Sequence, residues 1–344
     1  MVSPSSFPFI SVVIVNYNGI NFIESCLRSV LASNYPDLEI IFVDNASTDG
    51  SLDLMRQKFG SEPNIKIIAN KVGLGPSKGR NIGIENSKGK YIAFLDNDTE
   101  VDKDWLRELV SVLEEDYTIG AAQSKLLLSD RKTIDTCGHY LSITGFPYEI
   151  GSGELDSGQY NEIMDIFGAR SAAMFIRHSV LDQIGYFDPD YFMHSEETDL
   201  SWRVWLKNYR IVFVPTSIVY HKRGGSLNNQ ARNLMFYEGA KNCTKTLIKN
   251  LSPGRLLFML PMHIFIWLAL STLFIMKGRI ADGMAIIKGI LWNVSNIKKV
   301  SVDRKKVQSN RKIKDKHLFP VIMGNYSFSR LVKKGLSWIG RIYV

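Results

Sequence analysis

The chain has 344 residues, of which 45% are hydrophobic and 22% are charged, and its formal net charge is +8. This apolar content excludes wholesale disorder, and only three scattered cysteines exclude both a disulfide scaffold and a zinc site built from cysteine alone. The first eight residues contain neither a basic region nor a long apolar run, so no signal peptide is predicted and a reducing, cytoplasmic setting is expected.

The charge is divided unevenly along the chain. Residues 1–240 contain 22 Lys and Arg against 31 Asp and Glu, a net charge of −9. Residues 241–344 contain 20 Lys and Arg against three Asp, a net charge of +17. We therefore expect an acidic domain over 1–240 and a basic tail over 241–344 that is attracted to polyanions, either lipid headgroups or nucleic acid.

Strand and helix signals alternate along the first hundred residues. Apolar, β-branched runs predict strands over 10–17, 38–43, 65–69 and 91–95, with helices between them over 22–31, 51–58 and 77–87. Such an order is typical of an α/β fold with a parallel sheet covered on both faces. Ligands of these sheets bind beyond the carboxyl ends of the strands. Polar residues follow three of the predicted strands, at Asn16–Asn18, Asp44–Asn45 and Asp96–Asp98.

The middle and the tail have other patterns. Residues 135–170 are rich in Gly, Thr and aromatic residues, which predicts antiparallel ribbons and loops. Residues 256–276 form a run of 21 residues without a charge, long enough to cross a bilayer. The sequence further predicts helices over 178–184 and 197–207, a strand over 211–214, an amphipathic helix over 280–297, and then a basic run over 298–316.

Asp96 and Asp98 follow the fourth predicted strand. Two carboxylates one residue apart at a strand end can hold a hard divalent cation that also binds phosphate oxygens. A helix is predicted from about residue 102, so capping of that helix is the alternative role. The glycine-rich segment 73–79 does not fit the dinucleotide-binding motif G-x-G-x-x-G, because Lys78 stands where the third glycine would be required, and it does not match a Walker A motif either.

The order of the motifs is more specific than any one of them. It runs V-V-I-V-N-Y-N, V-D-N-A-S-T-D-G-S, N-K-V-G-L-G-P-S-K-G-R-N-I-G-I, F-L-D-N-D-T and G-Y-F-D-P-D-Y-F-M-H-S-E-E-T-D-L-S-W-R. This series resembles the family 2 glycosyltransferases, and most of all the branch that contains rhamnosyltransferases and other sugar transferases of surface polysaccharide assembly. The resemblance covers about residues 9–226. It implies the GT-A fold, a Rossmann-like and mostly parallel central sheet with helices on both faces, here followed by a helical, membrane-associated tail.

The resemblance also implies a donor site that binds a nucleotide-diphosphate sugar. Asn16 and Asp44 would belong to it, with Asp44 contacting a pyrimidine base and Arg80 lying near the same nucleotide. Asp96 would approach the ribose and the metal, and Asp98 would ligate the Mg²⁺ or Mn²⁺ that holds the diphosphate. His221 matches a histidine that reaches the metal or the diphosphate in several relatives; a plain loop residue is the alternative.

An acidic pair precedes the predicted helix over 197–207. By the resemblance Glu196 and Glu197 form the catalytic pair, with Glu197 as general base, although many relatives have aspartate at the second position. Acidic residues in a first helical turn also stabilise the helix dipole, so capping is the alternative role for Glu196, Glu197 and Asp199. Trp202 and Arg203 match family positions too, but on a helix they are expected to pack and to make structural hydrogen bonds.

The resemblance implies an inverting, metal-assisted glycosyltransferase of cell-surface glycan synthesis, with a saccharide or lipid-linked saccharide as acceptor. The tail is expected at the cytoplasmic face of the cell membrane, lying in its plane or spanning it. One alternative is a polyprenyl-phosphate sugar synthase, and another is a non-catalytic scaffold that binds membranes or nucleic acid. No aromatic residues are interleaved with the basic run 298–316, so nucleic acid is not expected as a partner.

Overall fold

The computed structural model describes residues 7–223 and 229–318. The end of the expected tail, 319–344, lies outside the described residues, and so do residues 1–6 and 224–228.

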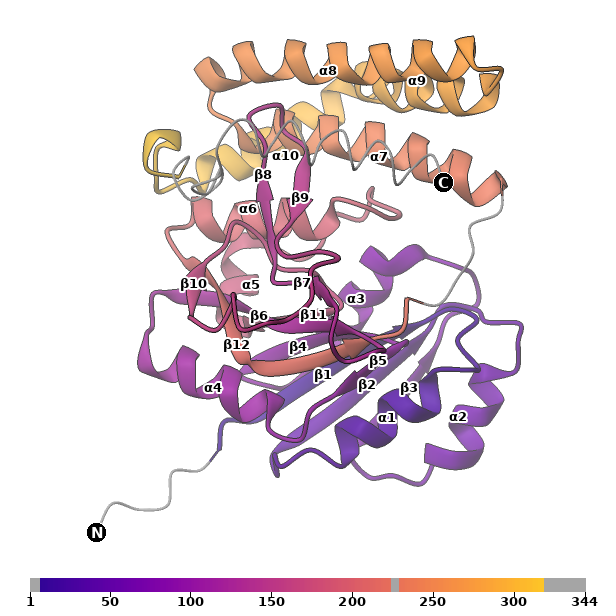
Figure 1. The fold of residues 1–344 in the computed structure, drawn as a ribbon, viewed down its shortest axis with the longest axis vertical. Coiled ribbons are helices and arrows are strands. Elements are labelled where there is room, and N and C mark those ends of the chain that lie inside the picture. Colours follow the sequence, from indigo (N-terminus) through magenta and orange to yellow (C-terminus); the bar gives the residue numbers. More distant parts are fainter. Residues whose placement is uncertain (1–6, 224–228, 319–344) are drawn as a thin grey trace.

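A ten-stranded mixed sheet forms the centre of the larger part of the molecule (Figure 1). The four predicted N-terminal strands form its parallel block, in which β1 pairs with both β2 and β4, and β2 with β3. The strands lie in the order β10 (Met164–Asp165), β12 (Arg210–His221), β6 (Ile119–Leu128), β11 (Ala173–Arg177), β4 (Tyr91–Asp96), β1 (Ile10–Asn16), β2 (Leu38–Asp44) and β3 (Ile65–Ala69). Two further strands lie off this path: β5 (Thr99–Val101) pairs with β12, and β7 (Ile134–Thr136) pairs with β6.

Helices cover both faces of this sheet, as the sequence predicts. They are α1 (Ile23–Leu31), α2 (Ser51–Phe59), α3 (Gly75–Glu85), α4 (Trp105–Glu115), α5 (His178–Ile184) and α6 (Glu196–Leu206). Side chains alternate between two hydrophobic cores, because Val13 of β1 belongs to one core and its neighbours Val12 and Ile14 to the other. The fold is thus α/β, with the predicted parallel block extended by strands of both directions.

Several elements differ from the prediction. Helix α4 begins at Trp105 after Asp104, so Asp96 and Asp98 lie in the β4–β5 turn and do not cap it. The short strand predicted over 211–214 extends to His221, because it pairs along its length with β6 and then with β5. The sequence does not predict β6, whose Gln123, Ser124 and Lys125 are buried although they break its apolar run.

A hairpin rises from the sheet in the segment where antiparallel ribbons are predicted. Its strands, β8 (His139–Leu141) and β9 (Pro147–Glu149), pair antiparallel and reach toward the C-terminal helices (Figure 1). At its tip the carbonyl oxygen of Thr144 lies 2.8 Å from Nδ1 of His263, and the ring of Phe146 packs on His263. The hairpin therefore joins the sheet to the tail.

Four helices follow the sheet: α7 (Asn229–Asn250), α8 (Pro253–Met276), α9 (Ile280–Ser295) and α10 (Ile297–Ser309). Residue 240, where the acidic domain was expected to end, lies inside α7. Helices α8 and α9 form the layer farthest from the sheet, with α7 and α10 between (Figure 1). Within the described residues, α8 is the one helix that is long and apolar enough to cross a membrane.

Close contact between α3 and β1 depends on Gly83. A Cβ atom built on this glycine would lie 2.3 Å from Cγ1 of the buried Val13, too close without movement of the strand or the helix. In an open helix, replacing glycine by alanine stabilises by about 1 kcal/mol. Here overpacking, which costs ~1–3 kcal/mol, should outweigh that gain.

We expect Gly83→Ala to lower the free energy of unfolding, measured by urea denaturation, by up to about 2 kcal/mol net of the helix-propensity gain. Gly254→Ala is the matched control, because nothing lies within 4 Å of the added Cβ atom in α8. The control should be neutral or slightly stabilising. Equal effects of the two substitutions would contradict the close α3–β1 packing.

Candidate active site

The carboxyl end of β4 brings together three of the predicted metal ligands. Strand β12 pairs antiparallel with β5, and this register sets His221 opposite Thr99, beside the β4–β5 turn. Ligand atoms of Asp96, Asp98 and His221 all lie within 4.8 Å of one another, and Nε2 of His221 is 3.2 Å from Oδ1 of Asp98. Residues 125 positions apart thus form one cluster.

Asp135 of β7 fixes the orientation of His221. Oδ2 of Asp135 lies 2.6 Å from Nδ1 of the imidazole, so the other ring nitrogen, Nε2, faces Asp98. Oδ1 of Asp135 pairs with Arg223. Burial alone would lower the pKa of His221, but the hydrogen bonds to Asp135 and Asp98 outweigh it and raise this pKa to about 10. Asp135 is not predicted as part of the site, because no pattern in the sequence links it to a histidine 86 residues away.

The residues of this cluster fit a divalent cation. Two carboxylates and one neutral imidazole nitrogen are ligands that Mn²⁺ accepts, so a cation held here would displace the proton that the raised pKa keeps on His221, and the carboxylates suit Mg²⁺. A carboxylate behind the ligating histidine is also the usual support for such a ligand, and Asp135 stands in that position.

Asn16 and Asp44 end neighbouring parallel strands and face each other in the pairing register. The amide of Asn16 donates to Asp44 Oδ1 at 2.9 Å and to Ser51 Oγ at 2.9 Å, and its oxygen accepts from Asn97 at 2.6 Å. Asp44 is completely buried and also accepts hydrogen bonds from the backbone and hydroxyl of Ser47. The network therefore connects the ends of β1, β2 and β4.

Arg80 links this end of the sheet to the acidic pair. Its Nη2 lies 2.9 Å from Asp96 Oδ1, and its Nη1 lies 3.0 Å from Glu196 Oε1. The guanidinium is buried, and the two carboxylates raise its pKa against the effect of that burial. Arg80 thus connects β4 to α6 through two ion pairs. The predicted position of Arg80 near the nucleotide does not include this structural role.

Glu197 lies in the first turn of α6 and its side chain is 13% exposed. Its Oε1 is 3.8 Å from Nε of Arg170, and its buried Oε2 has no hydrogen-bond partner among the described residues. Burial and the neighbouring Glu196 raise the pKa of Glu197 to about 7, although Arg170 opposes the shift. A carboxylate poised near neutral pH with an unpaired oxygen is suited to accept a proton.

The surroundings of Glu197 come from segments that the sequence analysis does not single out. Arg170 is held at 2.7 Å by Glu149 of β9, and His139 of β8 lies 3.3 Å from the hydroxyl of Thr198. These residues lie in the segment predicted as ribbons and loops, where composition carries no signal for a site. Only the folding of the β8–β9 hairpin beside α6 reveals them.

The other residues of α6 are structural. Trp202 is completely buried and packs edge-to-face on Phe167, as expected. Arg203 pairs with Asp199 at 2.9 Å and donates to the carbonyl oxygens of Ile184, Gly185 and Tyr186, also as expected. Glu196, Glu197 and Asp199 all lie in the first turn of α6, where their charges also favour the helix dipole, and Asp199 additionally pairs with Arg203.

Comparison with known proteins places this site in a family. Residues 11–140 match the family model described as Glycosyl transferase family 2, and residues 91–276 match Glycosyl transferase family group 2. The glycosyltransferase AglE of Haloferax volcanii is 27% identical over 63% of this chain and 68% of its own length. A poly-beta-1,6-N-acetyl-D-glucosamine synthase of Staphylococcus epidermidis is 26% identical over 61% of this chain, a match that spans about half of that synthase, 49%.

A solved structure supports the fold. The mannosyltransferase PcManGT of Pyrobaculum calidifontis, in complex with GDP-Man and Mn²⁺, superposes with a TM-score of 0.52 at 15% identity. The superposition covers 89% of this chain and 86% of that one. The second family model alone spans more than half of the chain and includes β4, α6, α7 and α8. The chain therefore belongs to glycosyl transferase family 2 and is a glycosyltransferase with the GT-A fold.

Proposed function

We propose that this glycosyltransferase moves a sugar, with inversion, from a nucleotide-diphosphate sugar to a hydroxyl of a saccharide or lipid-linked saccharide. The observation that carries the proposal is Glu197, a buried carboxylate with an unpaired oxygen and a pKa near neutrality. Through Glu196 and Arg80 it is linked to the acidic end of β4. A general base and a diphosphate-binding cluster then lie on opposite sides of one guanidinium.

Each acidic group has a different proposed task. Asp96, Asp98 and His221 would hold a divalent cation, which supplies positive charge against the departing nucleotide diphosphate. Asn16 and Asp44 would belong to the nucleotide site. The pyrimidine base of the donor, in contact with Asp44, would replace one of the groups that now donate a hydrogen bond to Asp44. Glu197 would take the proton of the acceptor hydroxyl during attack, and a single direct displacement inverts the anomeric centre.

The comparisons support this assignment of donor and product class. PcManGT binds GDP-Man with Mn²⁺, and the staphylococcal relative is named for the synthesis of a polysaccharide. The direct test of the donor is a panel of UDP-, dTDP- and GDP-sugars, incubated with the full chain and Mg²⁺ or Mn²⁺. Release of nucleotide diphosphate from one donor identifies the sugar nucleotide for the experiments below, and no release from any donor would contradict the proposal.

We expect Glu197→Gln to lower kcat roughly 10²–10⁴-fold, the usual contribution of a general base. Donor binding and thermal stability should hardly change, because glutamine keeps the packing and the metal cluster lies elsewhere. Glu197→Asp should keep partial activity, and Glu196→Gln should have a milder effect. Turnover near wild type in Glu197→Gln, with loss in Glu196→Gln or Asp199→Asn, would contradict the choice of base.

The pH dependence tests the same residue. Because the pKa of Glu197 is raised to about 7, its protonated, inactive form predominates below that pH. The rate should therefore rise with pH through about 7, well above the range of an ordinary glutamate, which titrates near 4.5. A profile of kcat/KM against pH in the wild type checks this, and in Glu197→Gln the acid limb should vanish.

We expect Asp98→Ala to abolish turnover and to weaken donor binding. Chelation with EDTA should abolish the activity of the wild type, and addition of Mg²⁺ or Mn²⁺ should restore that activity. Asp96→Ala should also lower activity, partly through the ribose and partly through the lost partner of Arg80. Full activity in chelator would contradict a role of Asp96, Asp98 and His221 in metal binding.

We further propose that the α8–α9 layer docks on the cytoplasmic leaflet of the membrane. Large apolar side chains are exposed along both helices: Leu257, Phe258, Met262, Phe265, Leu268, Leu273, Ile275, Met276, Ile280, Met284, Leu291 and Val294. Such a surface is larger than monomeric soluble proteins usually leave uncovered. The basic residues of α10 and the segment after it would add attraction to anionic lipid.

Docking in the plane of the membrane fits the packing better than a span. His263 and Trp267 of α8 contact the tip of the β8–β9 hairpin, so a spanning α8 would draw part of the catalytic domain into the bilayer. A second span by α9 would bury Asp282 and Lys288, at roughly 2.5–3.5 kcal/mol each near the centre of the bilayer. Helices lying in the interface avoid these costs.

Replacing Phe258 and Phe265 together by serine should weaken binding to anionic liposomes by about two to four orders of magnitude, since each exposed ring is worth on the order of 1.5–3 kcal/mol when buried. Tyr117→Ser is the control, because Tyr117 is equally exposed but lies after α4. Donor turnover in solution should not change. Cleavage or labelling of residues 300–316 from the outer face of intact cells would contradict docking in the plane.

A further inference from the structure

Glu197 follows a backbone segment in an unfavourable conformation. The segment 185–195 connects α5 to α6, and its last two residues, His194 and Ser195, both have a φ of +65°. Side chains other than glycine rarely adopt this region, and such conformations persist only where surrounding contacts enforce them. The next residues along the chain are Glu196 and Glu197, so whatever enforces this turn also places the proposed base.

Asn242 of α7 supplies contacts at the turn itself. Its Nδ2 donates to the carbonyl oxygen of Met193 at 2.7 Å and to that of His194 at 2.9 Å. The side chain is completely buried, and Nδ2 lies 3.1 Å from Glu238 Oε2 one turn earlier on the helix. Cys243 adds a contact of 3.1 Å between its sulfur and the hydroxyl of Ser195.

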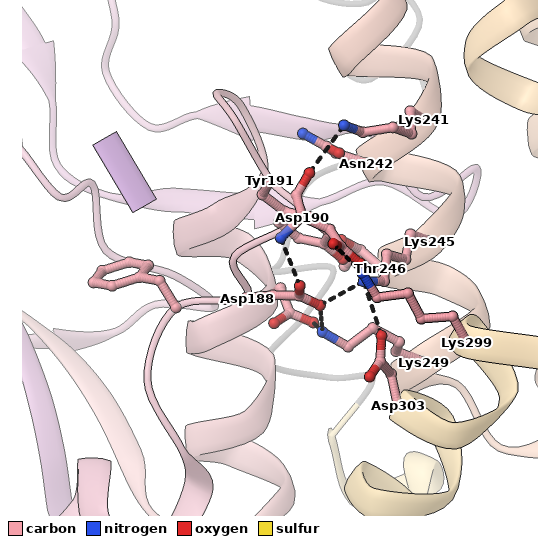
Figure 2. Close-up of polar contacts among 12 residues, drawn as sticks. Asp188, Asp190, Tyr191, Lys241, Asn242, Lys245, Thr246, Lys249, Lys299 and Asp303 are labelled. Carbon is pink, nitrogen blue, oxygen red and sulfur yellow. Dashed lines mark hydrogen bonds and ion pairs between the residues drawn. The ribbon is translucent and has the colours of Figure 1, made fainter. Parts of the chain in front are cut away.

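The same face of α7 holds the rest of the segment (Figure 2). Nζ of Lys245 lies 2.8 Å from Asp188, 2.7 Å from Asp190 and 2.9 Å from Asp303 of α10, and this lysine has no exposed surface. These three carboxylates are close enough to share a metal ion, but here the lysine ammonium lies among them.

Three more α7 side chains complete the contact. Lys249 pairs with Asp188 at 2.6 Å and Thr246 bonds the hydroxyl of Tyr191 at 2.9 Å. Lys241 donates to the carbonyl oxygen of Asp190 at 2.9 Å. Successive turns of one helix thus hold the segment from residue 188 to residue 195.

We propose that Asn242 is a positioning residue for Glu197, holding the 193–195 turn so that the first turn of α6 presents the carboxylate to the acceptor. The proposal rests on the proposed function, in which Glu197 is the general base. Without the amide donors of Asn242, two carbonyl oxygens next to the strained residues lose their partners, and the turn can relax toward ordinary backbone conformations. Displacement of a reacting group by about 1 Å is enough to cost ~10²-fold in rate.

Asn242→Leu removes these donors at similar side-chain size. We expect kcat to fall about 10- to 100-fold, with the donor KM little changed, because Asp96 and Asp98 lie on β4. Amide hydrogen exchange of residues 191–197 in the full chain should become faster, a readout that needs no substrate. Kinetics use the sugar nucleotide that the donor panel identifies.

Asn293→Leu is the matched control. Asn293 of α9 is also a buried asparagine whose Nδ2 donates to a backbone carbonyl on α7, that of Lys241, at 2.9 Å, but it does not touch the 193–195 turn. Its loss should cost comparable thermal stability. It should leave kcat and the exchange of 191–197 at wild-type values.

The acid limb of the pH profile is a second readout. The titratable groups around Glu197 come from several elements: Glu196, His194, Arg170, His139 and Cys243. A looser turn admits water and reduces the burial that raises the pKa of Glu197, so in Asn242→Leu the limb should move below about 7. Asn293→Leu, which should lower stability without affecting the 193–195 turn, should leave the acid limb of the pH profile at its wild-type position.

A double-mutant cycle separates this proposal from the one on which it rests. If Asn242 acts through Glu197, Asn242→Leu should lower kcat far less in the Glu197→Gln background than in the wild type. An equal loss in both backgrounds overturns the positioning role while leaving the base intact. Wild-type turnover in Glu197→Gln alone instead overturns the assignment of the base, and with it this proposal.

Should Asn242→Leu fail to fold, Thr246→Val decides the question. It removes only the hydrogen bond to Tyr191 in the same segment and keeps nearly the same side-chain shape. A drop in kcat of several-fold and faster exchange of 191–197, at unchanged donor KM, support the positioning of Glu197 by α7. Wild-type kcat and exchange in a folded Thr246→Val overturn it.

Discussion

One buried guanidinium holds the two acidic centres of this protein in place. Arg80 lies between Asp96 and Glu196, at 2.9 and 3.0 Å, with almost no exposed surface. The pair between Arg80 and Glu196 is buried on both sides, and breaking a buried pair by removing one partner costs ~3–5 kcal/mol, whereas Asp96 is partly exposed to solvent. Arg80 reaches both carboxylates because Gly79 and Gly83 let α3 approach β1 closely. The separation between the carboxylates at the end of β4 and those of α6 thus follows from how one helix packs on one strand.

The same electrostatic principle joins the tail to the catalytic domain. The strong positive charge of residues 241–344 predicts attraction to polyanions, but part of it is used inside the molecule. Lys245 and Lys249 are buried against Asp188 and Asp199, and their charges lower the pKa of Asp188 although its burial acts in the opposite direction. Because these ion pairs are buried, removing either partner would leave an uncompensated charge. Helix α7 is therefore part of the framework of the active site as much as the beginning of a tail.

The β8–β9 hairpin forms a second connection between the apolar layer and the site. At its base, Glu149 holds Arg170 beside Glu197, and at its tip Phe146 packs against His263 and Trp267 of α8. Gly145 at the tip has a φ of +81°, and a Cβ atom there would lie 2.7 Å from Leu247 of α7. Two connections, α7 and the hairpin, therefore link the outer helices to the surroundings of Glu196 and Glu197.

The amino-acid sequence is enough to predict the parallel block, the ends of its strands and the polar residues at those ends. Apolar runs such as 91–95 are local signals, and parallel strands must bring Asn16, Asp44 and Asp96 to one edge. The motif order was enough to bring Asp98, His221 and Glu197 into one hypothesis.

The groups that support these residues become visible in the folded chain alone. Asp135 behind His221, Arg170 beside Glu197 and Asn242 beneath the 193–195 turn come from segments far away in the chain. Their composition and periodicity are those of ordinary loops and helices, so no local pattern marks them. Burial raises the pKa of Glu197 and encloses the guanidinium of Arg80. Burial is likewise a property of the packed chain, because it depends on how many separate segments exclude water from the same point.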